Sequence, residues 1–394
     1  MKRIALLTNE LPHAGGPTGG LGTFVVRMAT ALSEYGAEPE IFVVEEKSPG
    51  PRDLSGIRVE SVPPARDWWL RGLSRVTRRW LRGPWGGPYA YVAGALALRR
   101  AVERRHRVAP FDIVHSTNCG ATGLLVKGAP GRIHLLRLSS DRANWFEHDG
   151  RGKTRGERVM AYLEALSARR ADAAYAPSRF LATSCARNWN TRVHVVRPPC
   201  VFDAAVNGSS NVPESEPAYL VHFGQLAPRK GTDLVARALV QAWEDAPAIR
   251  MVWAGAFRDP RDLERYRSWW GARSEQVAVL GRLGKAELYE VLQRALAAVL
   301  PSRVDNLPNT VIESLMFSVP VIGTDGASID ELVEPGRNGW LVPPEDVDTL
   351  AGTMVAVWNG EGTKLKRQFR APSVFEDMHP RRAVENLLRL AEPQ

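Results

Sequence analysis

The chain has 394 residues, of which 44% are hydrophobic and 24% are charged, and its 52 basic and 43 acidic side chains give a net charge of +9. Because this length exceeds the size at which one hydrophobic core usually stops growing, we expect two domains. Three cysteines without metal-finger spacing, no leader-like N-terminus and no membrane-spanning apolar window favour a cytoplasmic protein. The excess of positive charge favours a polyanionic or membrane-surface partner; we expect no nucleic acid.

Short apolar runs rich in β-branched residues alternate with helical patterns along the whole chain. In the first half they occupy residues 4–8, 40–44, 112–115, 132–138, 172–176 and 192–196. In the second half they occupy residues 219–223, 249–254, 277–280, 298–300, 319–322 and 339–342. Strands that are apolar almost throughout are covered by helices on both faces, so the pattern predicts an α/β fold of doubly wound parallel sheets.

A polar segment at residues 204–217 separates the two series and contains Asn207, Gly208 and two prolines. We therefore predict an N-terminal Rossmann-like domain at 1–203 and a C-terminal one at 218–375. A last helix in 376–394 is expected to pack back on the N-terminal domain. Ligands of such sheets bind beyond the carboxyl ends of the strands, so the loops after the strands are the places to look for a site.

The first such loop contains Gly15, Gly16, Gly19, Gly20 and Gly22 and precedes an apolar helical pattern. Glycines let backbone N–H groups approach a phosphate at a helix N-terminus. The spacing matches neither the dinucleotide fingerprint nor the P-loop, which disfavours a nicotinamide or ATP enzyme. A tight turn without a ligand explains the loop equally well.

A second loop, at residues 223–231, again follows a strand and precedes a helix. It places Arg229 and Lys230 beside Gly231. Two adjacent cations at a strand end would bind a diphosphate and offset the charge of a departing nucleotide. Arg229 taken alone is also compatible with an ordinary surface charge.

The third loop, at residues 301–314, contains two carboxylates eight residues apart, Asp305 and Glu313. Asn309 or Thr310 is a suitable helix cap, which would put Glu313 in the first helical turn, where the helix dipole favours a carboxylate. Carboxylates so placed could hold two different sugar rings of one ligand.

These residues resemble the acid-x7-acid signature of the family-4 retaining glycosyltransferases of the GT-B fold, in which two Rossmann-like domains face each other across a cleft. The resemblance extends over most of the chain, from Gly19 to Gly339. It implies that Glu313 binds ribose, that Arg229 and Lys230 clamp the diphosphate, and that Asp305 holds the donor sugar. The further donor-binding residues that we expect are Gly20, Gly22, Gln225, Arg282, Asn306, Leu307, Pro308, Asn309 and Thr310.

The sequence departs from the family pattern at several positions. Asp305 stands where the family usually has glutamate, and Gln225 stands where it has arginine. Two histidines that the family often carries in the N-terminal domain appear here as Thr117 and Ser139. The acceptor-side candidates are His115, which we expect at a strand end, and Asn118, Ser139 and Asp141. His134 is expected to pack inside the sheet.

Residues 67–85 form a basic insertion rich in tryptophan. On a helical wheel its apolar side contains Trp69, Leu73, Val76 and Trp80, and the opposite side contains Arg71, Arg75, Arg78 and Arg82. Such a helix suits an anionic bilayer or a lipid-linked acceptor at the inner face of the membrane. Alternatively, its apolar side packs on the N-terminal domain and the arginines are solvated.

The resemblance implies transfer of a sugar from a UDP- or GDP-sugar to an acceptor hydroxyl, with retained anomeric configuration. Products of such transfer include polysaccharides, glycolipids and glycosylated natural products. Neither a metal nor another cofactor is expected, and no protein nucleophile is assigned. Two alternatives stay open at this point: a sugar-nucleotide epimerase of the same architecture, and a glycosyltransferase-like binding protein without turnover.

Overall fold

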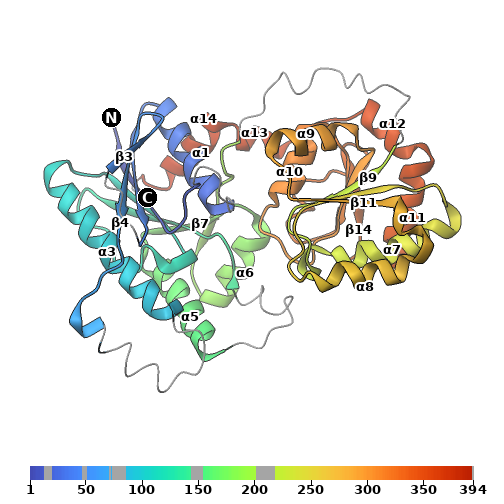
Figure 1. Ribbon diagram of the computed structural model, residues 1–394. Coiled ribbons are helices and arrows are strands. Elements are labelled where there is room, and N and C mark those ends of the chain that lie inside the picture. Colours follow the sequence, from blue (N-terminus) through green and yellow to red (C-terminus); the bar gives the residue numbers. More distant parts are fainter. Residues whose placement is uncertain are drawn as a thin grey trace. The chain divides into compact units, whose positions relative to one another are not determined.

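The computed structural model describes residues 1–12, 20–46, 51–70, 72, 86–142, 154–200 and 218–392. The chain divides into two compact units, shown in Figure 1. Unit 1 comprises Met1–Val201 together with Glu376–Gln394, and unit 2 comprises Phe202–Phe375. The predicted linker at 204–217 lies outside the described residues.

Unit 1 is built on an eight-stranded sheet in the order β3-β4-β2-β1-β5-β6-β7-β8. Its pairings are parallel except for the antiparallel pair β3–β4. The strands are β1 (Arg3–Thr8), β2 (Glu38–Val44), β3 (Pro51–Leu54), β4 (Ile57–Val62), β5 (Ile113–Thr117), β6 (Ile133–Arg137), β7 (Ala173–Ala176) and β8 (Val193–Val195). Each apolar run that we predicted in this half forms one of these strands.

The hairpin β3–β4 was missed. Its turn contains Ser55 and Gly56, both with positive φ (52° and 84°). A two-residue turn with positive φ at both positions matches the twist of paired antiparallel strands, and a glycine at its second position is a common hairpin signal. The hairpin could therefore have been predicted from its turn residues. It could not be predicted from apolar runs, because β3 has too few apolar residues.

The helices of unit 1 are α1 (Gly20–Glu34), α3 (Gly86–Val108), η1 (Cys119–Ala121), α5 (Arg155–Arg170), α6 (Arg179–Trp189) and α14 (Pro380–Arg389). Their ends follow from local chemistry. The Thr154 hydroxyl accepts from the N–H of Glu157, whose carboxylate accepts from the N–H of Thr154, which is a capping box at the start of α5. At the start of α6 the hydroxyl of Ser178 accepts from the N–H of Leu181, which is a simple N-cap.

The last helix, α14, belongs to unit 1 although unit 2 precedes it in the chain. Val384, Leu387 and Ala391 lie in the same hydrophobic cluster as α1, β1 and β2. Nearby, the N–H of Cys200 donates to the carbonyl of Met378 at 2.8 Å, which joins the two chain segments at the edge of the unit. Helix α13 (Val374–Met378) spans the boundary between the two units.

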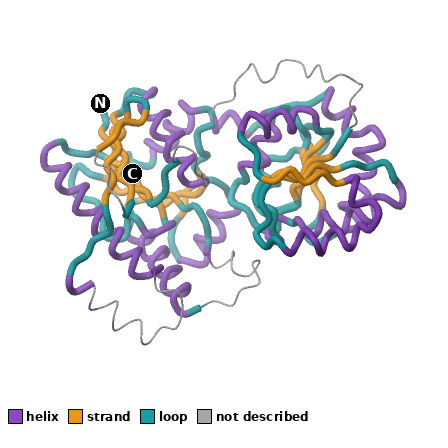
Figure 2. The backbone as a smooth tube through the Cα atoms, in the orientation of Figure 1, coloured by secondary structure: helices purple, strands orange, loops and turns teal. Residues whose placement is uncertain are grey.

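Unit 2 has a six-stranded, fully parallel sheet in the order β11-β10-β9-β12-β13-β14. Its strands are β9 (Leu220–Phe223), β10 (Met251–Ala254), β11 (Val277–Gly281), β12 (Ala297–Leu300), β13 (Val321–Thr324) and β14 (Gly339–Val342). Its helices are α7 (Thr232–Asp245), α8 (Arg261–Trp270), α9 (Lys285–Arg294), α10 (Asn309–Met316), α11 (Val347–Ala356) and α12 (Gly362–Arg367), with the short turns η3 (Pro228–Lys230), η4 (Gly271–Gln276) and η5 (Val357–Glu361). Figure 2 shows these strands between helices on both sides, so the predicted doubly wound fold is confirmed in both units.

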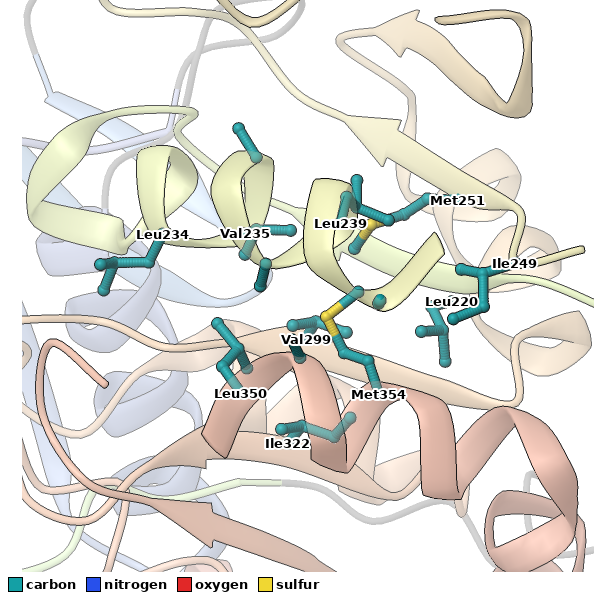
Figure 3. Close-up of a cluster of buried hydrophobic side chains, with 14 of the residues drawn as sticks. Leu220, Leu234, Val235, Leu239, Ile249, Met251, Val299, Ile322, Leu350 and Met354 are labelled. Atoms are coloured by element: carbon teal, nitrogen blue, oxygen red, sulfur yellow. The ribbon is translucent and has the colours of Figure 1, made fainter. Parts of the chain in front are cut away.

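The core of unit 2 lies between the sheet and the helices α7, α8 and α11. Figure 3 shows Leu234, Val235 and Leu239 of α7 facing Leu350 and Met354 of α11. All five side chains are at most 3% exposed. Strands β9 and β12 are paired neighbours in this sheet, and the candidate site is built where their carboxyl ends emerge.

The basic insertion lies largely outside the described residues, which include only 67–70 and 72 of it. Trp68 is 84% exposed and Trp69 is 42% exposed, whereas the adjacent Leu70 is fully buried in unit 1. The helical wheel had placed Trp69 on the apolar side together with Leu73, Val76 and Trp80, and these three lie outside the described residues. No described helix is long and apolar enough to cross a membrane.

Candidate functional site

The turn after β9 is shaped by two glycines with positive φ, Gly224 (104°) and Gly231 (73°). A Cβ at Gly231 would lie 2.0 Å from the carbonyl oxygen of Pro301, so the turn touches the backbone that follows β12. The turn also touches the loop after β10, because a Cβ at Gly255 would lie 1.8 Å from the carbonyl oxygen of Gly224. Only glycine permits these approaches.

A buried hydrogen-bond chain fixes the same turn from beneath. The Val299 carbonyl can only accept, so His222 donates to it from Nδ1 (2.7 Å) and accepts from the Thr232 hydroxyl at Nε2 (3.0 Å). The oxygen of that hydroxyl in turn accepts from the N–H of Ala227 (2.9 Å). Burial lowers the pKa of His222 to about 4, so the ring is neutral at pH 7. His222 and Thr232 were not among the predicted site residues.

Several predicted residues meet where β9 and β12 end. The Lys230 ammonium, from the turn after β9, contacts the Asp305 carboxylate, from the loop after β12. Both side chains are largely buried, at 19% and 15% exposed. Arg229 donates to the amide oxygen of Gln225, which precedes it in the same turn. The structure therefore brings Lys230 and Asp305 together as a partly desolvated pair of opposite charges.

The loop from Asp305 to Pro308 is held in an unusual backbone shape. Leu307 has φ of 73°, a value that side chains other than glycine seldom adopt. Ser328, fully buried in the loop after β13, accepts from the N–H of Leu307 (2.6 Å) and donates to the carbonyl of Asp305 (3.2 Å). The N–H of Asn306 donates to the Asp305 carboxylate (3.0 Å). Ser328 thus positions the segment that precedes α10, although sequence analysis did not single it out.

The predicted start of α10 was wrong by one or two residues, depending on whether Asn309 or Thr310 is taken as the predicted cap. The helix begins at Asn309, its N-cap is Pro308 in an extended conformation, and no side chain caps it. Glu313 is consequently the fifth helical residue and lies in the second turn, not the first. The reason is that Pro308 fixes its own φ and has no N–H to lose, so it can end the loop without a polar cap. A Cβ at Gly224 would lie 2.9 Å from Thr310, so the start of α10 approaches the turn after β9.

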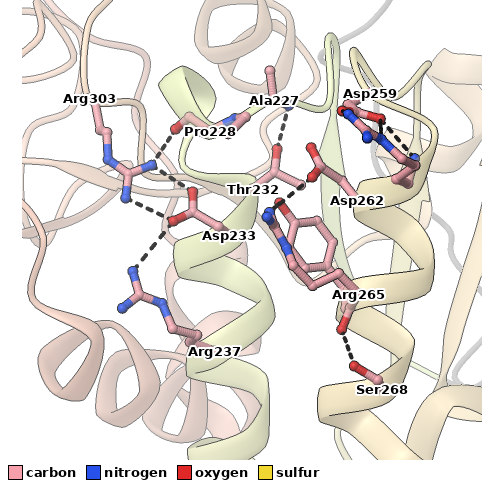
Figure 4. A network of polar contacts seen from close by, with 12 residues as sticks. Ala227, Pro228, Thr232, Asp233, Arg237, Asp259, Asp262, Arg265, Ser268 and Arg303 are labelled. Carbon is pink, nitrogen blue, oxygen red and sulfur yellow. Dashed lines mark hydrogen bonds and ion pairs between the residues drawn. The ribbon is translucent and has the colours of Figure 1, made fainter. Parts of the chain in front are cut away.

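Arg303 is a site residue that sequence analysis missed (Figure 4). Its guanidinium forms two hydrogen bonds to Asp233 (2.6 and 2.9 Å), contacts Glu345, and donates to the carbonyl of Pro228. The N–H of Arg303 also donates to the carbonyl of Arg229 at 3.0 Å. Burial opposes the charge of Arg303, but the hydrogen bonds that it donates to Asp233 and Glu345 outweigh this effect and raise its pKa. Arg303 therefore holds the basic turn in place.

The remaining predicted donor residues belong to other elements. Arg282 is exposed after β11, which is two strands from β9 in the sheet. In unit 1, Gly20 and Gly22 are in the first turn of α1, and a Cβ at Gly22 would lie 3.3 Å from Pro12. Residues 13–19 of the glycine loop lie outside the described residues.

The acceptor-side candidates form buried contacts in unit 1. His115 lies in the middle of β5, not at its end, is 1% exposed and shares a 2.6 Å hydrogen bond with the Tyr175 hydroxyl. Burial lowers the pKa of His115 to about 3. The expected strand-end position was wrong because β5 extends two residues further than predicted. His134 packs inside the sheet as expected, with Nε2 2.7 Å from the hydroxyl of Ser116.

Asn118, Ser139 and Asp141 stabilise the loops at the carboxyl edge of the same sheet. Asn118 accepts from the N–H of Ser139 (2.7 Å) and donates to the carbonyl of Ser140 (2.8 Å). Asp141 accepts from Ser184 and Asn188 of α6, at 3.0 and 2.7 Å. Among the described residues, no group of three or more His, Cys, Asp or Glu side chains could hold a metal ion.

Two family models match the chain. The model described as "Glycosyltransferase Family 4" matches residues 18–201, and the one described as "Glycosyl transferases group 1" matches residues 217–359. The D-inositol 3-phosphate glycosyltransferase of Mycolicibacterium smegmatis is 23% identical over 394 residues, covering 93% of this chain and 86% of that protein.

Solved structures share the fold at low sequence identity. Sucrose-phosphate synthase from Thermosynechococcus elongatus has a TM-score of 0.70 at 17% identity and covers 99% of this chain and 98% of that chain. HepE of Anabaena in complex with UDP has a TM-score of 0.65 at 16% identity and covers 99% of this chain and 100% of that chain.

Two parallel-sheet units of this kind, and these relatives, define a GT-B glycosyltransferase that uses a nucleotide-activated sugar. The chain belongs to glycosyltransferase family 4, and its second half carries the group 1 domain. Both family models describe glycosyltransferases, and the relative from Mycolicibacterium smegmatis is named as one, which disfavours the epimerase that the sequence had left open.

Proposed function

We propose that the protein transfers a sugar from a UDP- or GDP-sugar to an acceptor hydroxyl with retention of the anomeric configuration. The observation that carries this proposal is the contact between Lys230 and Asp305 at the ends of the neighbouring strands β9 and β12. When a donor binds, the contact between Lys230 and Asp305 is replaced by contacts with the ligand. Lys230 then binds the diphosphate, and Asp305 binds a sugar hydroxyl. The similar fold of HepE in complex with UDP supports a uridine donor as the first to test.

The chemistry assigned to the protein is positioning and electrostatic stabilisation. The acceptor oxygen forms a bond to the anomeric carbon while the bond from that carbon to the diphosphate breaks. The acceptor proton passes to a phosphate oxygen of the departing diphosphate. Arg229 and Lys230 would offset the charge that this group gains, and Arg303 keeps both on one rigid turn.

Glu313 is proposed to bind the ribose hydroxyls from the second turn of α10. Glu313→Gln should weaken nucleoside diphosphate binding, because a charge-assisted hydrogen bond worth roughly 1.5–3 kcal/mol becomes a neutral one. Titration calorimetry with UDP and GDP measures this loss. Equal affinities of parent and variant would remove Glu313 from the donor site.

The acceptor is proposed to bind in unit 1. The relative in Mycolicibacterium smegmatis is named for D-inositol 3-phosphate, which makes polyols and their phosphates reasonable first acceptors. Incubation with a panel of sugar nucleotides, each with and without candidate acceptors, distinguishes the outcomes. Transfer supports the proposal, whereas an epimerised donor or binding without product refutes it. Performing the same assay in excess chelator tests the expectation that no metal is needed.

A lipid-linked acceptor at an anionic membrane remains a second proposal, supported by the exposed Trp68 and Trp69. Arginines near an anionic surface attract it by roughly 1 kcal/mol each, and salt weakens this attraction. Co-sedimentation with anionic vesicles that is lost at high salt, and lost on replacing Arg71, Arg75 and Arg78 by glutamine, is the expected result. Failure of the parent to bind such vesicles at low salt would refute it.

A further inference from the structure

Arg137 is a buried cation whose charge no described side chain neutralises. It is the last residue of β6, at the carboxyl edge of the unit 1 sheet, and is 8% exposed. One guanidinium nitrogen donates to the Ser139 hydroxyl at 2.7 Å, and the Cζ atom lies 3.9 Å from the centre of the Phe24 ring. Within the described part of the chain, no carboxylate forms an ion pair with it.

A second arginine in the same unit, Arg142, is partly buried, with 24% of its side chain exposed, and provides a comparison. Arg142 hydrogen-bonds to the fully buried carboxylate of Glu164 at 2.9 and 3.1 Å. Burial opposes the charge of Arg142, but the carboxylate outweighs it and raises the pKa. Burial instead lowers the pKa of Arg137 to about 10, because no carboxylate among the described residues pairs with it to offset the loss of water. Arg142 thus has its counter-ion in Glu164, whereas Arg137 has none in the described part of the chain.

The surroundings of Arg137 favour an anion. Phe24, which stacks on the guanidinium, is the fifth residue of α1, so Arg137 lies close to the start of that helix. The positive end of α1 already has a carboxylate beside it, because a Cβ at Gly22 would lie 3.4 Å from Oε1 of Glu10, so the charge of Arg137 itself is what favours an anion here. A guanidinium presents its N–H groups as a planar fork that matches the oxygens of a phosphate or a carboxylate.

We propose that Arg137 forms an anion subsite in unit 1 that binds a phosphate or carboxylate group of the acceptor. The acceptor would then be a negatively charged hydroxyl compound, held by its anionic group at Arg137 while another hydroxyl receives the sugar. This proposal rests on the proposed function, since it names the acceptor class of the same transfer. A buried charge that only the substrate neutralises would also select against neutral acceptors.

The first test measures melting temperatures of the full-length protein in increasing inorganic phosphate. Phosphate should stabilise the parent but not Arg137→Met, and that variant should melt at or above the parent temperature without phosphate, because an uncompensated buried charge is gone. Arg142→Met is the matched control: it leaves Glu164 unpaired, so it should melt lower while keeping the response to phosphate. A response that persists in Arg137→Met and disappears in Lys230→Ala would refute the subsite. A large loss of stability in Arg137→Met without phosphate would also refute it.

The second test measures transfer to matched acceptor pairs, such as inositol and inositol phosphate, or glucose, glucose 6-phosphate and glucuronate. The parent should prefer the charged member of each pair. Arg137→Lys should raise the KM for that charged acceptor by about tenfold or more, with a smaller change in kcat. Equal use of neutral and charged acceptors overturns the subsite but leaves the transferase function standing. Absence of transfer to every acceptor contradicts the proposed function instead, and the phosphate response then decides the subsite alone. Weakened UDP or GDP binding in Arg137→Met would reassign the residue to the donor and refute the acceptor role.

Discussion

Asp233→Asn would test whether the pair between Asp233 and Arg303 holds the basic turn of unit 2. The two side chains are 18% and 14% exposed and share two hydrogen bonds. The substitution keeps the size of the side chain but removes the charge that raises the pKa of Arg303. Arg303 would then depend on Glu345, whose side chain is 55% exposed.

The expected cost follows from how deeply the pair is buried. Breaking a fully buried ion pair costs roughly 3–5 kcal/mol, whereas surface pairs contribute about 0–1 kcal/mol. Since both partners keep some contact with water, we expect Asp233→Asn to cost about 2–3 kcal/mol. For a unit of this size that is a fall of roughly 5–10 °C in Tm. Glu345→Gln, the matched control on the exposed side of the same arginine, should cost no more than about 1 kcal/mol.

Two measurements test whether the pair anchors the turn: calorimetric melting of the parent and both variants, and their transfer rates at saturating donor. Asp233→Asn should lower both the melting temperature and the transfer rate, because Arg303 also holds the carbonyls of Pro228 and Arg229 beside Lys230. If the two variants lose equal stability, or if Asp233→Asn melts within about 2 °C of the parent, the pair does not anchor the turn.

Three further predictions concern the same unit. Gly231→Ala should destabilise the protein by more than the roughly 1 kcal/mol of strain that a left-handed backbone costs, because the new Cβ would meet the Pro301 carbonyl. Gly336→Ala is the control: its φ of 75° is similar and the space around it is open, so it should cost the strain alone. Equal melting temperatures of the two variants would contradict this prediction. Lys230→Ala should lower kcat by about a hundredfold at saturating donor, whereas a rate within a few-fold of the parent would assign the clamp to Arg229 or to backbone amides. His222→Gln should reduce the acid sensitivity of the free energy of unfolding. The unfolded histidine takes up a proton near pH 6.5 and the folded one only near pH 4, so between these values falling pH destabilises the parent by up to ~1.4 kcal/mol per pH unit. An unchanged pH dependence of the unfolding free energy in denaturant titrations would contradict the buried neutral ring.

Much of the fold followed from local patterns in the sequence. Parallel strands covered on both faces are apolar along their whole length, and each such run became a strand. The hairpin β3–β4 lies at the edge of the unit 1 sheet, so its signal was the turn at Ser55 and Gly56 rather than an apolar run. The start of α10 was misplaced because an extended Pro308 replaced the side-chain cap that Asn309 or Thr310 would have provided.

The site was predictable where its residues follow strands, and not where they act through distant partners. Lys230 and Asp305 come after β9 and β12, which pair in the sheet, so their approach follows from topology. Arg303 and Ser328 belong to the site only because of contacts with residues 21 to 75 positions away in the chain. No spacing rule connects such partners, and their roles become visible only once the loops are folded.

The return of α14 to unit 1 has a consequence for how the protein is made. Unit 1 takes its first two hundred residues from the beginning of the chain and its last helix from the end, so unit 2 is inserted into it. During synthesis, unit 2 can complete its sheet while unit 1 still lacks Val384 and Leu387, and the part of α1 that packs against α14 stays uncovered until α14 has been made. A chain that stops before α14 would therefore leave the ribosome with a complete unit 2 and an exposed hydrophobic surface on unit 1.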